Sequence, residues 1–92
     1  MKVCDHWTEK YAAIDFKGGV LEFWEDRGED MLEVWYENGC LIDVGYNQRL
    51  DTFFVIIIKD DDWAVPVRTM AVRREQDLVS AIRTAVDIAA GL

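Results

Sequence analysis

The stretch GVLEFWEDRGEDMLEVWYENGCLIDVGY, residues 19–46, decides the fold because short apolar runs alternate in it with turn signals. One signal is the DRGE loop around Gly28. The other is Asn38-Gly39, a pair that suits a two-residue hairpin turn. A third signal, Gly18-Gly19, overlaps the start of the stretch and suits the same kind of turn. The stretch therefore predicts consecutive antiparallel hairpins.

The same alternation continues on both sides and predicts strands at residues 10–16, 20–25, 31–37, 40–46, 53–59 and 64–71. Pro66 cannot donate a hydrogen bond to a ladder, so the last strand belongs at or near an edge of the sheet. After Glu75 the apolar residues recur at helical spacing. The predicted fold class is α+β, an antiparallel β-meander of five to six strands with one C-terminal helix packed on one face.

The segment before the first turn has two interpretations. Trp7, Tyr11 and Ile14 fit one face of a helix, which would extend a helix into residues 10–16. A strand over residues 10–16 would instead let Gly18-Gly19 close a hairpin with matched apolar faces. We expect the strand.

Composition limits the class of protein. The chain has 92 residues, and 51% of them are hydrophobic. We therefore expect residues 1–92 to form a single domain with a packed core. The longest apolar run is too short to cross a bilayer, and Met1 to Asp5 offer no secretory signal, so we expect a cytoplasmic protein without a membrane partner. Eighteen acidic against ten basic residues argue against direct nucleic-acid binding and favour a basic protein partner.

The turns also predict which residues lie opposite one another. A two-residue turn at Gly18-Gly19 places Asp15 opposite Glu22, and a symmetric DRGE loop places Glu22 opposite Glu33. One face then collects apolar side chains for the helix to cover: Ile14, Phe16, Leu21, Phe23, Leu32, Val34, Tyr36 and Leu41. Along the third strand, the Asn38-Gly39 turn places Glu33 opposite Val44 and Trp35 opposite Ile42.

The opposite face is the candidate binding site. It collects Asp15, Glu22 and Glu33 in one row flanked by Trp24 and Trp35, within a segment, residues 22–37, that has seven acids and one base. Like charges opposite one another destabilise a sheet, whereas carboxylates beside indoles suit Arg or Lys of a partner. The predicted partner-binding residues are Asp15, Glu22, Trp24, Glu33, Trp35 and Glu37. The alternative is a solvated face screened by Lys17 and Arg27.

Catalytic and cofactor motifs are not found in the sequence. His6 is the only histidine, and Cys4, His6 and Cys40 do not make the four-ligand pattern of structural zinc. The DDD run at residues 60–62 lacks the ligand spacing of a calcium loop and fits a polar hairpin tip. We therefore expect no metal, no cofactor, two reduced thiols and no enzymatic activity.

Three hypotheses of function follow. The leading one is a stoichiometric inhibitor that blocks a basic surface on a partner such as a toxin or a nucleic-acid-binding protein. Immunity proteins and phage-encoded inhibitors of host defence offer an analogy of size and charge alone. The second is an assembly subunit that forms a homodimer or larger homo-oligomer through the Trp24 and Trp35 face. The third is a small-ligand binder or enzyme that uses the row Asp15, Glu22 and Glu33.

Overall fold

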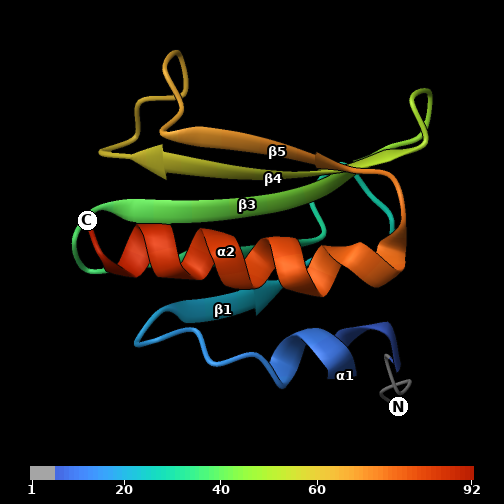
Figure 1. The fold of residues 1–92 in the computed structure, drawn as a ribbon, viewed down its shortest axis with the longest axis horizontal. Helices are drawn as coiled ribbons and strands as arrows, with labels where there is room; N and C mark the ends of the chain where they lie inside the picture. The colour runs from blue at the N-terminus through green and yellow to red at the C-terminus, as the bar shows by residue number, and fades with distance from the viewer. Residues whose placement is uncertain (1–5) are drawn as a thin grey trace.

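The computed structural model describes residues 6–92, which form a five-stranded antiparallel sheet with its strands side by side in chain order. The strands are β1 (Val20–Phe23), β2 (Leu32–Trp35), β3 (Cys40–Asn47), β4 (Thr52–Lys59) and β5 (Arg68–Val72). The helical elements are α1 (His6–Ala12), the short 3-10 helix η1 (Glu75–Asp77) and α2 (Leu78–Ala90). Helix α2 lies across one face of the sheet (Figure 1). The α+β meander predicted from the sequence is confirmed.

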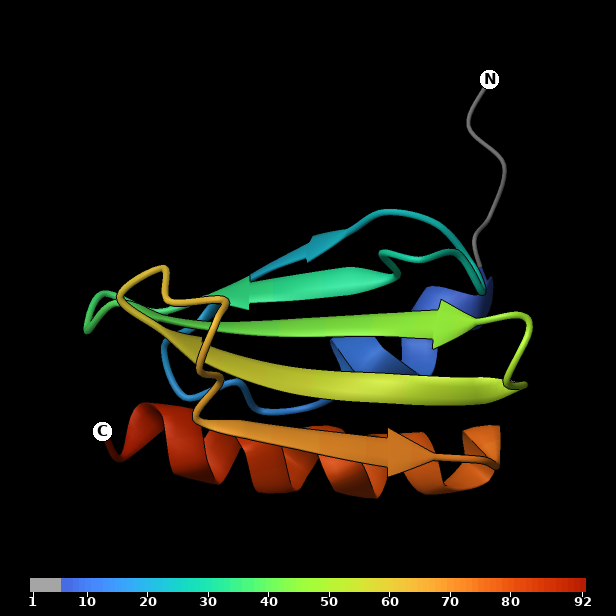
Figure 2. The ribbon, with the colours of Figure 1, turned by 90° about the horizontal axis from the view of Figure 1, so that it is seen from above.

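The core lies between α2 and the sheet. Helix α2 buries one face, made of Leu78, Ile82, Ala85, Val86 and Ala89. Opposite it, the strands contribute the alternate residues that point toward α2, including Leu32, Val34, Ile42, Val44, Val55 and Ile57. Viewed from above, α2 lies on one side of the sheet and no described helix lies on the other (Figure 2). We call the side without a helix the outer face.

Most of the predicted core face is confirmed. Ile14 and Phe16 are buried, and Leu21 and Phe23 are partly buried against the core. Leu41 is buried but stands opposite Trp35, so it belongs to the outer face. The Cys40 thiol is free and buried, while Cys4 lies outside the described residues.

The predicted first strand is wrong, because α1 and a linker occupy that part of the chain. Helical spacing lets Trp7 pack edge-on against Phe23, with 5.4 Å between ring centroids, and buries Tyr11 completely. The turn before β1 is centred one residue earlier than predicted, at Lys17 and Gly18, which both have positive φ. Gly19 instead allows close packing, because a Cβ there would lie 2.5 Å from Val34 Cγ1.

The β2–β3 turn also differs from the prediction by one residue. The Tyr36 carbonyl accepts from Gly39 N at 3.2 Å, and Tyr36 N donates to the Cys40 carbonyl at 2.9 Å, so the loop has three residues. Only Gly39 in this loop has positive φ, whereas a two-residue type I′ turn would need it at Asn38 as well. As a result Glu33 stands opposite Asp43 rather than Val44, and Trp35 stands opposite Leu41 rather than Ile42.

The last strand begins at Arg68, later than predicted, and lies at the edge of the sheet as Pro66 suggested. Residues 60–67 form the β4–β5 loop, in which Asp60 and Asp61 take positive φ. Within residues 6–92, no helix combines the length and apolarity that crossing a membrane requires.

Candidate partner-binding face

A row of carboxylates crosses three strands of the outer face. Glu22 of β1 stands opposite Glu33 of β2, as predicted, and Glu33 stands opposite Asp43 of β3. We call Glu22, Glu33 and Asp43 the carboxylate row. On β4 the residue opposite Asp43 is Ile56, so an apolar side chain lies directly beside the third carboxylate.

Asp15 does not join this row. It is exposed in the linker between α1 and β1, where its Oδ1 accepts a hydrogen bond from Lys17 N at 2.9 Å. The predicted position of Asp15 opposite Glu22 is wrong, because β1 is an edge strand with β2 as its only described neighbour. Asp43 takes the third position in the row, which the incorrect Asn38-Gly39 register had concealed.

A folded loop brings a further carboxylate to the row. The β1–β2 loop bends over β3, where Tyr46 N donates to the Gly28 carbonyl at 2.9 Å. Gly45 permits this approach, because a Cβ at Gly45 would lie 1.9 Å from the Glu29 carbonyl oxygen. Asp30 thereby joins Glu33 and Asp43. A glycine inside a strand pattern signals such a close backbone approach, so Gly45 could have been identified from the sequence.

Asp30, Glu33 and Asp43 form what we call the acidic cluster. One carboxylate oxygen from each lies within 4.8 Å of the others. Burial, together with the charges of Asp30 and Glu33, raises the pKa of Asp43 to about 6. Burial also raises the pKa of Glu33, despite a hydrogen bond from Trp24 that acts in the opposite direction. Asp43 Oδ1 is buried and accepts no hydrogen bond from a described group.

This cluster is the one place in residues 6–92 where at least three His, Cys, Asp or Glu side chains converge closely enough to hold a metal ion. Three carboxylate oxygens could serve as ligands for a hard cation such as Ca²⁺, and equally as acceptors for a guanidinium or ammonium group. The sequence-based expectation that the protein needs no metal stays a prediction.

The two tryptophans beside the carboxylate row are exposed. Trp24 and Trp35 keep 57% and 50% of their surface accessible, an unusual loss of apolar burial for side chains of this size. The Trp24 indole donates a hydrogen bond from Nε1 to Glu33 Oε1 at 3.2 Å, which fixes the ring next to the row. Glu37 is also exposed, in the β2–β3 turn rather than in the row.

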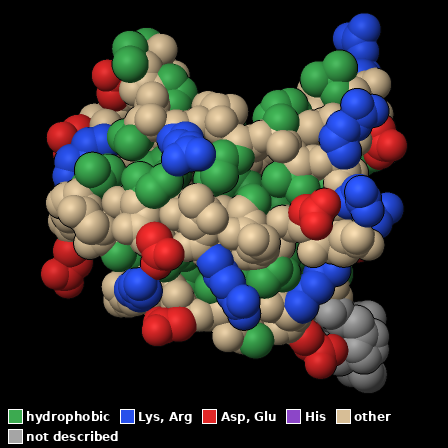
Figure 3. All heavy atoms as spheres, viewed as in Figure 1, with side chains coloured by type: hydrophobic (Ala, Val, Ile, Leu, Met, Phe, Trp, Pro, Cys, Tyr) green, Lys and Arg blue, Asp and Glu red, His purple; other side chains and the backbone are tan. Residues whose placement is uncertain are grey.

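The bases that could screen the row pair with acids elsewhere. Arg27, the single base among residues 22–37, forms an ion pair with Glu75 of η1, which Lys10 also binds at 2.7 Å. Lys17 binds Asp87 of α2 at 2.7 Å. No ion pair between described residues involves Glu22, Glu33 or Asp43. The face covered by α2 carries acids and bases interspersed (Figure 3).

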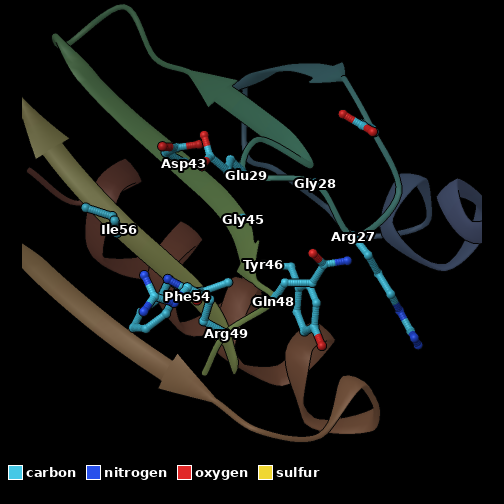
Figure 4. A pocket seen from close by; sticks show the side chains of 12 residues that line it. Arg27, Gly28, Glu29, Asp43, Gly45, Tyr46, Gln48, Arg49, Phe54 and Ile56 are labelled. Carbon is cyan, nitrogen blue, oxygen red and sulfur yellow. The ribbon is translucent and has the colours of Figure 1, made fainter. Parts of the chain in front are cut away.

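A groove of about 660 Å³ opens beside the acidic cluster. Its floor is formed by Asp43 and Gly45 of β3 with Phe54 and Ile56 of β4, and the β1–β2 loop forms one side. Asp43 and Glu29 both line the groove, whereas the Arg27 side chain points away from it (Figure 4). The groove therefore combines the carboxylates of its loop side and of Asp43 with apolar side chains of β4.

A second hollow, of about 520 Å³, lies further along the same two strands. It is lined by Leu41 and Ile58, two residues from Asp43 and Ile56, and by Trp35. Asp60 and Asp61 of the β4–β5 loop form its acidic rim.

Searches of protein-family models, of curated proteins and of solved structures found no match to this chain.

Proposed function

We propose that this chain is a protein-binding module, without enzymatic activity, whose outer face covers a basic surface on a partner protein. The observation that carries the proposal is the carboxylate row on the sheet face that no described helix covers, with no cationic partner among the described residues. Like charges directly opposite one another cost about 0.2–1 kcal/mol per pair. A partner's Arg or Lys would turn this repulsion into attraction through charge-assisted hydrogen bonds.

Trp24 and Trp35 support the same proposal. Their faces can stack on a guanidinium, and tryptophan is frequent among the residues that dominate binding energy at interfaces. Because each is about half exposed in the free chain, a partner can bury the remaining apolar surface. Covering a basic surface in this way would block any toxin or nucleic-acid-binding activity that uses it. We therefore propose a stoichiometric inhibitor as the specific role.

The test compares two variants with equal net charge. Glu22→Lys with Glu33→Lys reverses the row, whereas Asp77→Lys with Asp87→Lys makes the same charge change near α2, away from the outer face. A partner is first captured by cross-linking in the cell of origin, and is then purified for calorimetry with each variant. We expect one-to-one binding that weakens at least tenfold for the row variant alone. Equal weakening in both variants, or in neither, would contradict the proposal.

Exposed Val20, which stands opposite Trp35, favours a second candidate, a homo-oligomer formed through the same face. A two-fold dimer brings the same surface of each copy together, so the carboxylate row of one copy would approach that of the other. Repulsion between the rows opposes this dimer at neutral pH. Sedimentation equilibrium distinguishes the candidates: Trp24→Ala with Trp35→Ala would dissociate such a dimer, whereas the binding module is monomeric before and after the change.

A further inference from the structure

The groove and the second hollow follow one another along β3 and β4. Asp43 and Ile56 line the groove, and two residues further along the same strands Leu41 and Ile58 line the hollow. Residues two apart on a strand point to the same face and are separated by about 7 Å. The outer face therefore offers an acidic position and an apolar position at a fixed spacing.

We propose that the groove and the hollow together form a trough for an extended segment of the partner protein. In this trough, an Arg or Lys of the segment lies at the acidic cluster. A large apolar side chain two positions along the segment, with one residue between them, fills the hollow beside Trp35. The inference rests on the proposed function and adds to it the type of partner segment that the face accepts.

Charge complementarity identifies the segment as cationic. The groove carries Glu25 and Glu29 on its loop side and Asp43 on its floor, and the hollow carries Asp60 and Asp61 on its rim. Of the two arginines that line the groove, Arg27 is paired with Glu75. The other, Arg49, lies beyond β3 in the β3–β4 turn. A guanidinium or ammonium group is therefore favoured along most of the trough.

Spacing identifies the segment as extended. In an extended chain, side chains i and i+2 point the same way and lie about 7 Å apart, which matches the separation of Asp43 from Leu41 along β3. The hollow favours an apolar occupant because the half-exposed ring of Trp35 lies there beside Leu41 and Ile58, which are already buried. A helical segment would present side chains three or four residues apart instead.

The test is a series of Gly/Ser peptides with one Arg and one Leu, placed next to each other or separated by one, two or three residues, in both orders. Each has a matched peptide with neutral citrulline in place of Arg. Binding is followed through backbone amide shifts of the isotope-labelled protein. We expect the largest shifts along β3 and β4, and binding at least threefold tighter with one intervening residue than with any other spacing. Citrulline should abolish this preference.

Three variants assign the two positions. Asp43→Asn should reduce the difference between the Arg and citrulline peptides severalfold, and Trp35→Gln should reduce the difference between Leu and Ala peptides severalfold. Leu92→Gln, which changes an exposed apolar residue at the C-terminal end, should leave both differences unchanged. Peptides that bind through Arg without a spacing preference, or unaffected by Trp35→Gln, would overturn the trough and leave the proposed function standing. Equal binding of Arg and citrulline peptides would contradict both, and no binding of any peptide would overturn the trough alone.

Discussion

Asp43 carries a charge that the folded protein accommodates poorly. Its pKa is raised to about 6, first by burial and then by Asp30 and Glu33. In the unfolded chain the pKa should be near 3.9, so the folded state holds the proton more tightly. Stability from this group is therefore fully present below the unfolded pKa and is lost as pH rises through 6.

Asp43→Asn removes the charge while keeping the shape of the side chain. We expect the free energy of unfolding to increase by about 1 kcal/mol at pH 8, allowing for screening by solvent at this partly exposed site. The gain should shrink as pH falls from 6 toward 4, because the native carboxyl is then protonated. Urea unfolding of both proteins across this range measures it. A gain independent of pH would show that the charge is not the cause.

Leu32, next to Glu33 in β2 but on the face toward α2, tests the assignment of the core. It is completely buried, whereas Val20 of the adjacent strand is 67% exposed. Leu32→Ala should lower the free energy of unfolding by about 2–5 kcal/mol, because it removes buried methyl groups and leaves a cavity. Val20→Ala should change it by less than about 0.5 kcal/mol. Similar losses for both, measured by urea unfolding, would contradict the assignment of faces.

The β1–β2 loop depends on Gly45 for its position over β3. Gly45→Ala should lift the loop, because the new Cβ would meet the Glu29 carbonyl oxygen. Asp30 would then move away and water would reach Asp43, so the pKa of Asp43 should fall toward its ordinary range. Carboxyl NMR titration measures this. Gly18→Ala is the control. Gly18 has positive φ but open space around it, so the substitution should lower stability through backbone strain and leave the pKa of Asp43 unchanged.

Local sequence predicted most elements but not every register. The β1–β2 pairing was correct, because a symmetric loop leaves one register that keeps Leu21 and Phe23 on the core face. The β2–β3 pairing was wrong, because Asn38-Gly39 serves both two-residue and three-residue loops and only long-range packing selects between them. Residues 10–16 were predicted as a strand, although α1 extends to Ala12, because local preference could not show that Trp7 would pack on Phe23. The acidic cluster was therefore found only in part.

Charge is separated between the two sides of the molecule. The formal net charge is −8, yet Lys10, Lys17 and Arg27 pair with acids of η1 and α2, on the helix side. The outer face keeps its carboxylates without basic partners among the described residues. The resulting field should attract a basic partner over a distance of about 8–10 Å at physiological salt, and less as salt increases.

Steering by charge and retention by the indoles should appear in different rate constants. Glu33→Lys weakens the field before contact, so it should lower the association rate severalfold at low salt and less at high salt. Trp35→Ala acts after water is expelled from the interface, so it should mainly raise the dissociation rate, by about tenfold or more. Surface plasmon resonance with the captured partner at several salt concentrations separates the two effects.

Neither change should unfold the protein, because Trp35 is half exposed and Glu33 lies on the face away from α2. Asp87→Lys, which alters charge by the same amount on α2, serves as the control for net charge. If Asp87→Lys slowed association as much as Glu33→Lys, total charge rather than the carboxylate row would set the rate. If Trp35→Ala changed only the association rate, the indole would contribute to encounter rather than to the closed interface, and the proposed binding face would need a different anchor.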